Sequence, residues 1–391
     1  MSPGPLGFAP ARPWEAHDHA PFAGLPPESW SPELHLLSEL VDALTDRACL
    51  AILAELGIPV PGHLELLVDD LRLGAGVTDE RAPDFHWLWR RLDWSGLLTG
   101  EAGGEVEDVL PLPWDEPALA AALELHGGRL GTTAALIEHV RASWPAWLRG
   151  QKDGKQVLFS RRALELWEGY FQNGNAPIAA LNALGAHAVE RALAGRDGLR
   201  GLEVGGGLGS GAEALLRRLG PRLASYELTE LTPVLLPRGE ARARAAAPPG
   251  LQLSARLLDL DQPLGPQGVV PGGLDLIYGV NTLHAARDLV ASLRALRAGL
   301  APGGALVLAE CVLPAPGAAL APELVFRLSP QFHQVLPEPG VRERGGFLDE
   351  PGWRAALQRA GFSRVELVPE LARAHAAYRP FAMAAIVART E

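Results

Sequence analysis

Residues 202–211 read LEVGGGLGSG, and this stretch decides the fold. A short apolar run contains an acid, Glu203, and leads into three glycines at alternate positions, Gly205, Gly207 and Gly209. The helix-forming run AEALL follows at once over residues 212–216. This order predicts a strand, a tight turn and a helix start, which is where an α/β sheet meets a nucleotide-like ligand. A dinucleotide fingerprint, G-x-G-x-x-G, would need glycine at position 210, where the chain has serine, so the spacing excludes a dinucleotide.

The pattern that the chain does satisfy, E-x-G-x-G-x-G, resembles motif I of class I S-adenosylmethionine (SAM) methyltransferases. SAM has no pyrophosphate, and the resemblance implies a turn that lets the backbone approach the amino-acid part and the ribose closely. It also implies a cofactor-binding role for Glu203, Gly205, Gly207 and Gly209. In this interpretation Glu203 orders both the turn and the nearby ammonium group.

Strand and helix patterns alternate regularly from Leu199 onward, which favours a largely parallel sheet with helices on both faces. The predicted strands cover residues 201–204, 224–228, 251–257, 274–279, 305–309, 364–368 and 382–388. Seven strands is the number found in class I methyltransferases. The expected fold class is therefore α/β, a Rossmann-like seven-stranded methyltransferase core behind a mostly helical N-terminal lid or cap.

The chain divides into three predicted regions. Residues 1–30 are Pro-rich and aperiodic, and we expect an arm on the surface. Residues 31–195 form the helical cap or lid domain, and residues 196–391 form the SAM-binding domain. The helices expected in the cap cover residues 32–48, 48–56, 84–98, 116–125, 132–140 and 161–171. The apolar face of the third consists of Phe85, Leu88, Leu92 and Trp89.

Two further acids occupy positions where a bound SAM needs acceptors. Glu230 follows the second strand and is expected to accept from the ribose hydroxyls, with Glu227 as the competing acid. After the third strand, Asp259 is expected to accept from the adenine amino group, while Leu260 stacks on the ring. A solvated loop is the alternative for this second pair.

The fourth strand is followed by NTLHA over residues 281–285, and an acid, Glu310, closes the fifth strand. This arrangement resembles the methyltransferase domains of polyketide synthases, over about residues 200 to 390. The resemblance implies that His284 is a general base and that Glu310 orients its imidazole, with Asn281 near the cofactor. Taken singly, a capping histidine and a satisfied strand-end acid are the alternatives.

Polar and aromatic side chains on both sides of the sheet domain are candidates for contact with the substrate. Before the domain, these are Tyr170, Phe171 and Asn175, for which an ordinary capped turn is the alternative. After the fifth strand, they are Gln331, His333 and Gln334. His333 could also act as a second base or bind a mononuclear divalent metal, although no spacing such as His-x-x-x-His occurs here. Arg327, Arg342 and Arg344 are weaker candidates for binding a carboxylate or a carrier's phosphate.

Composition excludes several other classes of protein. The 391 residues include 46 acidic and 35 basic side chains, giving a formal net charge of −11, which argues against nucleic acid as a partner. The two cysteines, Cys49 and Cys311, are too few for a disulfide framework and favour a reducing cytoplasm. We expect no secretory signal and no membrane span.

Together these patterns predict a SAM-dependent methyltransferase of polyketide or related secondary metabolism. The expected reaction methylates the α-carbon of an acyl chain carried by an acyl carrier protein. Three alternatives remain at this point: an O-methyltransferase acting on a free small molecule, a metal-dependent enzyme acting on a malonyl-type starter unit, and a non-catalytic scaffold with the same fold.

Overall fold

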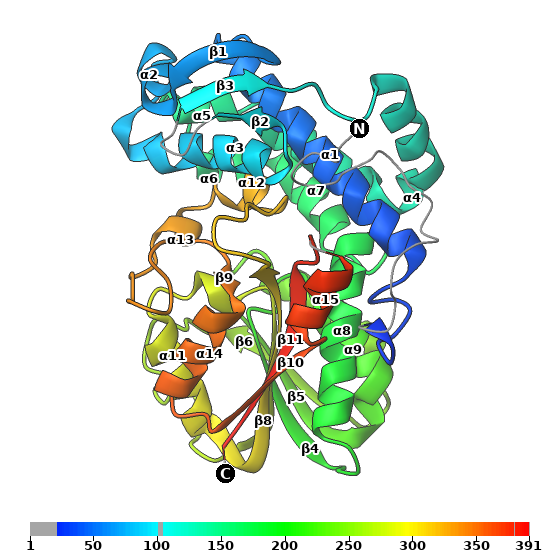
Figure 1. Ribbon diagram of the computed structural model, residues 1–391. Helices are drawn as coiled ribbons and strands as arrows, with labels where there is room; N and C mark the ends of the chain where they lie inside the picture. Colours follow the sequence, from blue (N-terminus) through cyan, green and yellow to red (C-terminus); the bar gives the residue numbers. More distant parts are fainter. Residues whose placement is uncertain (1–21, 101–104, 379, 391) are drawn as a thin grey trace. The chain divides into compact units, whose positions relative to one another are not determined.

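The computed structural model describes residues 22–100, 105–378 and 380–390, and they form two compact units (Figure 1). The helical unit contains residues 35–170 and 315–330. The sheet unit contains the described residues up to 34, residues 171–314 and those from 331 onward.

An eight-stranded sheet forms the centre of the sheet unit, with strand order β10-β11-β8-β7-β4-β5-β6 and β9 paired with β8. The strands are β4 (Leu199–Val204), β5 (Leu223–Glu230), β6 (Gln252–Leu257), β7 (Leu274–Val280), β8 (Leu300–Leu313), β9 (Leu348–Asp349), β10 (Arg364–Val368) and β11 (Met383–Arg389). Neighbours from β6 to β8 are parallel, whereas β11 is antiparallel to both β8 and β10. The predicted α/β methyltransferase fold is confirmed, and the short β9 is added to the seven expected strands.

Helices cover both faces of this sheet, and most residues of its central strands β4, β7 and β8 are accordingly buried. The helices α8 (Ala176–Ala192), α9 (Ser210–Leu219) and α10 (Leu236–Ala246) share a buried core with one face. On the other side, α11 (Leu289–Gly299) packs against β8 and against α14 (Glu350–Arg359). The remaining short helices are η4 (Gly220–Arg222), η5 (Leu283–Ala285), α13 (Pro330–His333) and α15 (Leu371–Ala377).

The described end of the Pro-rich region belongs to the sheet unit and differs from the surface arm we expected. Phe22 and Trp30 are both buried, and their rings stack with centroids 4.5 Å apart. Trp30 also meets Phe381 edge-on at 5.0 Å. Aromatic packing therefore holds residues 22–30 against the segment before β11, while the earlier part of the predicted arm lies outside the described residues.

The helical unit consists mainly of α1 (Pro32–Glu55), α3 (Ala82–Trp94) and α4 (Glu116–Arg141). Its shorter elements are α2 (Val68–Gly74), η3 (Asp79–Arg81), α5 (Trp144–Leu148), α6 (Gly154–Leu158), α7 (Arg161–Tyr170), α12 (Glu323–Phe326) and the three-stranded sheet β1 (Gly62–Leu67), β3 (Glu105–Val109) and β2 (Leu98–Thr99). The predicted apolar face of the helix near residue 85 is confirmed, since Phe85, Leu88, Trp89 and Leu92 are all buried.

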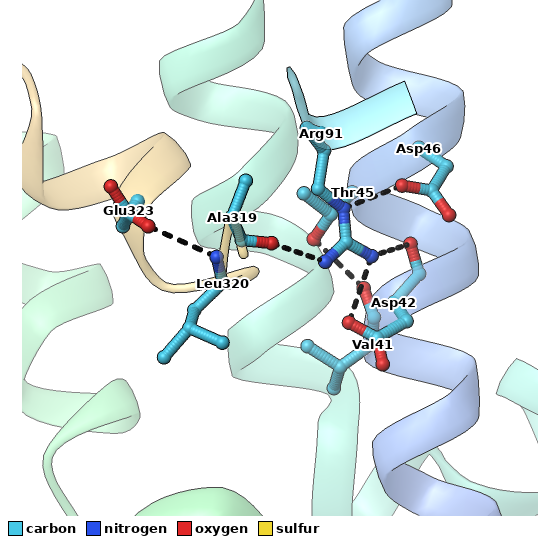
Figure 2. Close-up of polar contacts among 8 residues, drawn as sticks. All are labelled: Val41, Asp42, Thr45, Asp46, Arg91, Ala319, Leu320 and Glu323. Atoms are coloured by element: carbon cyan, nitrogen blue, oxygen red, sulfur yellow. Dashed lines mark hydrogen bonds and ion pairs between the residues drawn. The ribbon is translucent and has the colours of Figure 1, made fainter. Parts of the chain in front are cut away.

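One segment of the helical unit comes from far along the chain, and buried arginines hold it there (Figure 2). Arg91 on α3 donates to Oδ1 of Asp46 at 2.6 Å and to Oδ1 of Asp42 at 2.8 Å. Its Nη1 donates to the carbonyl of Ala319 at 2.9 Å. A second arginine, Arg327, pairs with Asp84 at 2.8 Å. Residues 315–330, which follow β8, are thus fixed within this unit.

The division between the units does not follow the boundary expected at residues 195/196. Helix α8 groups with the sheet, and residues 315–330 group with the helices. A lid or cap function for residues 31–195 remains a prediction. None of the helices in the described parts of the chain is long and apolar enough to cross a membrane, and a cytoplasmic location also remains a prediction.

Candidate functional site

The glycine turn after β4 has a backbone that only glycine adopts without strain. Gly205, Gly207 and Gly209 have φ values of +63°, +53° and +79°. A Cβ on Gly205 would lie 2.0 Å from Oγ1 of Thr282, and one on Gly209 would lie 2.5 Å from the carbonyl oxygen of Gly239. A Cβ on Gly207 would meet only the Gly205 carbonyl oxygen, at 4.0 Å. Two glycines are therefore required by packing, and Gly207 borders open space.

Glu203 lies beneath this turn and is 1% exposed. Its Oε2 accepts a hydrogen bond of 2.8 Å from the hydroxyl of Tyr226 on β5. Burial raises the pKa of Glu203 to about 8, against hydrogen bonds from Tyr226 and from the backbone of Ala212 that lower the pKa. The carboxyl group thus ties the strand to the start of α9. Our sequence interpretation missed Tyr226, although strand alternation in β5 marks it as an inward-facing polar residue.

Glu230 ends β5 and lies against the same turn. Its Oε2 accepts from the backbone N–H of Gly207 at 2.9 Å, and its Oε1 accepts from that of Thr232 at 2.8 Å. The competing acid, Glu227, forms an ion pair with Arg256 on β6 instead, with a separation of 2.8 Å. Each oxygen of Glu230 keeps a second acceptor direction for a further donor.

Asp259 and Leu260 follow β6 at the same edge of the sheet, and both are half-buried. Oδ1 of Asp259 accepts from the N–H of Asp261 at 2.9 Å. The carbonyl of Leu260 accepts from Ser292 at 3.1 Å. These contacts fix the loop backbone, while the Leu260 side chain takes part in none of these bonds.

Asn281 follows β7 and combines backbone strain with an unsatisfied polar atom. Its φ is +49°, a left-handed value that asparagine tolerates better than most residues. Its N–H donates to the carbonyl of Ala309 at 2.7 Å. Its Oδ1 is buried and accepts no hydrogen bond from the described residues. A buried orphan acceptor of this kind points to a missing donor, such as a ligand.

His284 and Glu310 form a buried pair, as the resemblance implied. Nδ1 of His284 lies 2.8 Å from Oε2 of Glu310, and these residues are 4% and 0% exposed. Oε1 of Glu310 also accepts from the backbone N–H groups of Thr282 and Leu283, at 3.0 and 2.8 Å. The ring of Phe347 lies 4.6 Å from the imidazole and that of Phe332 lies 6.2 Å away, centroid to centroid. The imidazole therefore has a fixed carboxylate at Nδ1 and aromatic walls.

The residues predicted to contact the substrate are divided between the two units. Tyr170 belongs to the helical unit, where its ring lies 6.0 Å from that of Trp167. Phe171 accepts from Arg242 through its carbonyl at 2.7 Å, and Asn175 is the buried N-cap of α8. The exposed residues of the second group are Gln331, His333 and Gln334. Their roles remain predictions.

Asn173, which our sequence interpretation passed over in favour of Asn175, makes the polar contacts in this region. Its Nδ2 donates to the carbonyl of Ser210 and to Oε2 of Glu213, both at 3.0 Å. Its Oδ1 accepts from Asn182 at 2.8 Å. Asn173 thus joins the segment before α8 to the first turn of α9. The residues around position 173 in the sequence do not indicate that Asn173, more than Asn175, makes these hydrogen bonds.

The expectation for two of the arginines is wrong. Arg327 is buried in ion pairs with Asp84 and Glu323, and Arg342 is buried against backbone carbonyls. Both are therefore engaged within the protein, and of the three arginines only Arg344 is exposed. For the predicted metal, the described residues contain no group of three or more His, Cys, Asp or Glu side chains that could hold an ion.

Comparison with known proteins concerns the sequence and fold of the chain as a whole. Residues 202–306 match the family model described as a methyltransferase domain. Polyketide synthase ThaQ of Burkholderia thailandensis is 31% identical over 242 residues, which is 59% of this chain and 11% of that protein. This chain thus spans about a tenth or less of the curated relatives it matches.

Solved structures with the same fold include the CurJ carbon methyltransferase, with a TM-score of 0.73, 21% identity and coverage of 92% of this chain and 93% of that one. The trans-methyltransferase CalH, in complex with SAH, has a TM-score of 0.61 at 19% identity and 90% coverage of both chains. Residues 202–306 therefore match a methyltransferase domain, and the chain has the fold of the CurJ carbon methyltransferase and of CalH.

Proposed function

We propose that this chain, which carries a methyltransferase domain of the class I fold, transfers the methyl group of SAM to the α-carbon of a carrier-bound acyl substrate in polyketide biosynthesis. His284 is the general base, and Glu310 orients it. The observation that carries this proposal is the buried pair in which Nδ1 of His284 lies 2.8 Å from Oε2 of Glu310. Similarity to polyketide synthases supports the substrate class.

The geometry suits a base at Nε2. A carboxylate at Nδ1 holds the proton on that nitrogen, which leaves the lone pair of the neutral ring on Nε2. Among the described residues, no hydrogen bond engages Nε2. A proton on a carbon between a thioester and a ketone is acidic enough for a base that works near neutral pH.

The reaction balances with the groups named. When bound, SAM would supply the methyl group, whose bond to the sulfonium sulfur would break as S-adenosylhomocysteine is formed. His284 takes the proton of the substrate α-carbon at Nε2, and the electron pair left on that carbon forms the new carbon–carbon bond. The imidazolium, stabilised by Glu310, then returns its proton to solvent. The aromatic rings of Phe332 and Phe347 limit the access of water to the imidazole.

The edge of the sheet fits SAM. The open space beside Gly207 and the orphan Oδ1 of Asn281 both indicate a ligand there. In the proposed arrangement Gly207 admits the cofactor, Glu230 accepts from its ribose hydroxyls, and Asp259 with Leu260 receives the adenine. Glu203 orders the turn through Tyr226 and the start of α9. The SAH complex of CalH supports this choice of cofactor.

The remaining assignments concern the acyl chain and its carrier. We assign residues 31–195 a role as cap and residues 196–391 the role of SAM-binding domain. The side chains that would line the path of the acyl chain are Tyr170, Phe171, Asn175, Gln331, His333 and Gln334. Their mixture of aromatic and amide groups suits a β-ketoacyl chain, which has both apolar and hydrogen-bonding parts.

The substitution His284→Ala tests the proposal. We expect the turnover of a carrier-bound β-ketoacyl thioester with labelled SAM to fall by about 10²- to 10⁴-fold, the contribution of a general base. The affinity for SAM, measured by calorimetry, should remain within about threefold of the wild-type value. The reason is that His284 is proposed to take the substrate proton and is not part of the glycine turn. His126→Ala, on α4, is the matched control. Unchanged turnover in His284→Ala would contradict the role of His284 as base, and a wild-type chain that binds no SAM would contradict the function itself.

A further inference from the structure

Arg342 is a buried cation that is devoted to the backbone around His284. It lies in the segment between α13 and β9 and is 7% exposed. Its Nη1 donates to the carbonyl of His284 at 2.9 Å, and its Nη2 donates to those of Ala286 and Arg287 at 2.6 and 2.8 Å. Its Nε donates to the carbonyl of Leu336 at 3.3 Å.

The contacts of Arg342 differ from those of an ordinary ion pair. Among the described residues, no carboxylate lies within 4.0 Å of the guanidinium. The nearby acids that raise its pKa through their charge are Asp288, Glu338 and Asp261, but burial has the larger effect and lowers the pKa. Burying a cation this far is costly unless its N–H groups are satisfied, and here backbone carbonyls satisfy them. The main effect of burying Arg342 is therefore to form the hydrogen bonds with the carbonyl groups of residues 284–287.

These contacts complete a clamp on η5, the three-residue helix that carries His284. Glu310 accepts from the N–H groups of Thr282 and Leu283, which enter this turn. Arg342 donates to the carbonyl groups of His284, Ala286 and Arg287, which lie at the end of this turn and directly after it. An anion at the N–H end and a cation at the carbonyl end complement the dipole of a helical turn. A single 3₁₀ turn is not stable by itself, so these two side chains fix its backbone.

We propose that Arg342 is a positioning residue for the base, an inference that rests on the proposed function of His284. It holds the backbone of residues 284–287 so that the imidazole remains on Glu310 and Nε2 keeps a fixed direction. The same segment of chain ends in Phe347 and starts after Phe332, the two rings beside the imidazole. Movement of this segment would therefore change the position of the base and of its walls together.

The inference is tested by NMR of the full chain labelled with ¹⁵N-histidine, together with turnover. The proton between Nδ1 of His284 and Glu310 should give a downfield imidazole N–H signal, assigned by its loss in His284→Ala. In Arg342→Ala, we expect this proton to exchange with solvent at least about tenfold faster. Turnover should fall by about 10- to 100-fold, because a displacement of about 1 Å is enough to cost this much. SAM affinity should remain within about threefold.

Two further variants separate positioning from stability. Arg373→Ala removes an exposed arginine of the sheet unit, on α15, and should leave both the signal and turnover as in the wild type. Arg342→Lys keeps the charge but can reach fewer carbonyls than the planar guanidinium, so its signal and turnover should lie between those of wild type and Arg342→Ala. Millimolar guanidinium added to Arg342→Ala should restore part of the turnover and slow the exchange.

The failure of this inference can be distinguished from failure of the proposed function. If Arg342→Ala matches Arg373→Ala in both signal and turnover while His284→Ala is inactive, the inference is wrong and the base assignment stands. If His284→Ala has wild-type turnover, the assignment of His284 as base is wrong. The exchange rate of the imidazole N–H proton in Arg342→Ala then still tests whether Arg342 holds the backbone of residues 284–287. If Arg342→Ala does not fold, Arg342→Lys decides, because a wild-type signal and turnover in that variant would overturn the inference.

Discussion

Nδ1 of His284 lies 2.8 Å from Oε2 of Glu310, although the two residues are 26 positions apart in the chain. The register of the sheet brings them together, because Val280 at the end of β7 pairs with Ala309 on β8. The residues that follow Val280 are thus placed beside Glu310. Three donors, one imidazole and two backbone N–H groups, converge on its carboxylate.

Glu310→Gln should disrupt this pair without changing its size. An amide offers one acceptor oxygen and an NH₂ donor, so it cannot satisfy three donors at once. We expect turnover to fall about 100-fold, within the range for loss of an oriented base, and SAM affinity to stay within about threefold. Glu343→Gln, an exposed acid on the segment after α13, is the control. Equal turnover in the two variants would contradict the orienting role of Glu310.

The glycine turn allows a matched pair of substitutions. Gly209→Ala places a Cβ 2.5 Å from the Gly239 carbonyl oxygen, so we expect a loss of stability greater than the roughly 1–2 kcal/mol of a left-handed alanine. Gly207→Ala carries only that backbone cost, because its Cβ would face open space. It should nevertheless weaken SAM binding at least about tenfold. Urea unfolding and calorimetry measure the two effects. Unchanged SAM affinity in Gly207→Ala would show that the cofactor does not approach this residue.

Glu203 makes stability depend on pH. Its pKa is raised from 4.5 to about 8, so between these values the folded chain keeps a proton that the unfolded chain has lost. The free energy of unfolding should therefore fall as pH rises through this window, by about 2 kcal/mol between pH 6 and 8. Glu203→Gln should remove that part of the slope, and Glu240→Gln, on α10, should retain it. Thermal unfolding at several pH values tests this prediction, and identical slopes in all three proteins would refute it.

Arg91 anchors residues 315–330 in the helical unit. Arg91→Met would leave Asp42 and Asp46 without their cation, and burial already raises the pKa of Asp46 to about 6. We expect a loss of about 3–5 kcal/mol in the free energy of unfolding, as for other broken buried pairs. Arg141→Met, whose partners Glu55 and Glu138 are exposed, should lose less than about 1 kcal/mol. Urea unfolding that gave similar losses for both variants would contradict the anchoring role.

Some of this architecture could be predicted from sequence because its physical signal is local. Strands such as β7 are mostly apolar since helices cover both faces, and this run of apolar residues can be found in the sequence. Glycine misled the prediction elsewhere. Residues 116–141 form a single helix, whereas two helices over residues 116–125 and 132–140 were expected, and Gly127, Gly128 and Gly131 lie between those two ranges. Each glycine costs a helix only about 1 kcal/mol, which packing outweighs.

The site could be predicted in part for the same reason. His284 follows the end of β7, Glu310 lies near the end of the neighbouring β8, and parallel strands bring their carboxyl ends to one edge. Arg342 could not be found in this way, because its contacts with residues 284–287 leave no pattern around position 342. Tyr226 and Asn173 are similar cases, since each acts on a residue more than 20 positions away.

The most direct test of the central claim is to locate the transferred methyl group. The full chain is incubated with SAM carrying a ¹³C-methyl group and a carrier-bound β-ketoacyl thioester, and the released product is examined by NMR. The account predicts a ¹³C-methyl group on the carbon between the thioester and the ketone, formed by the wild type and not by His284→Ala. A label found only on oxygen, or only on a free small-molecule hydroxyl, would contradict it.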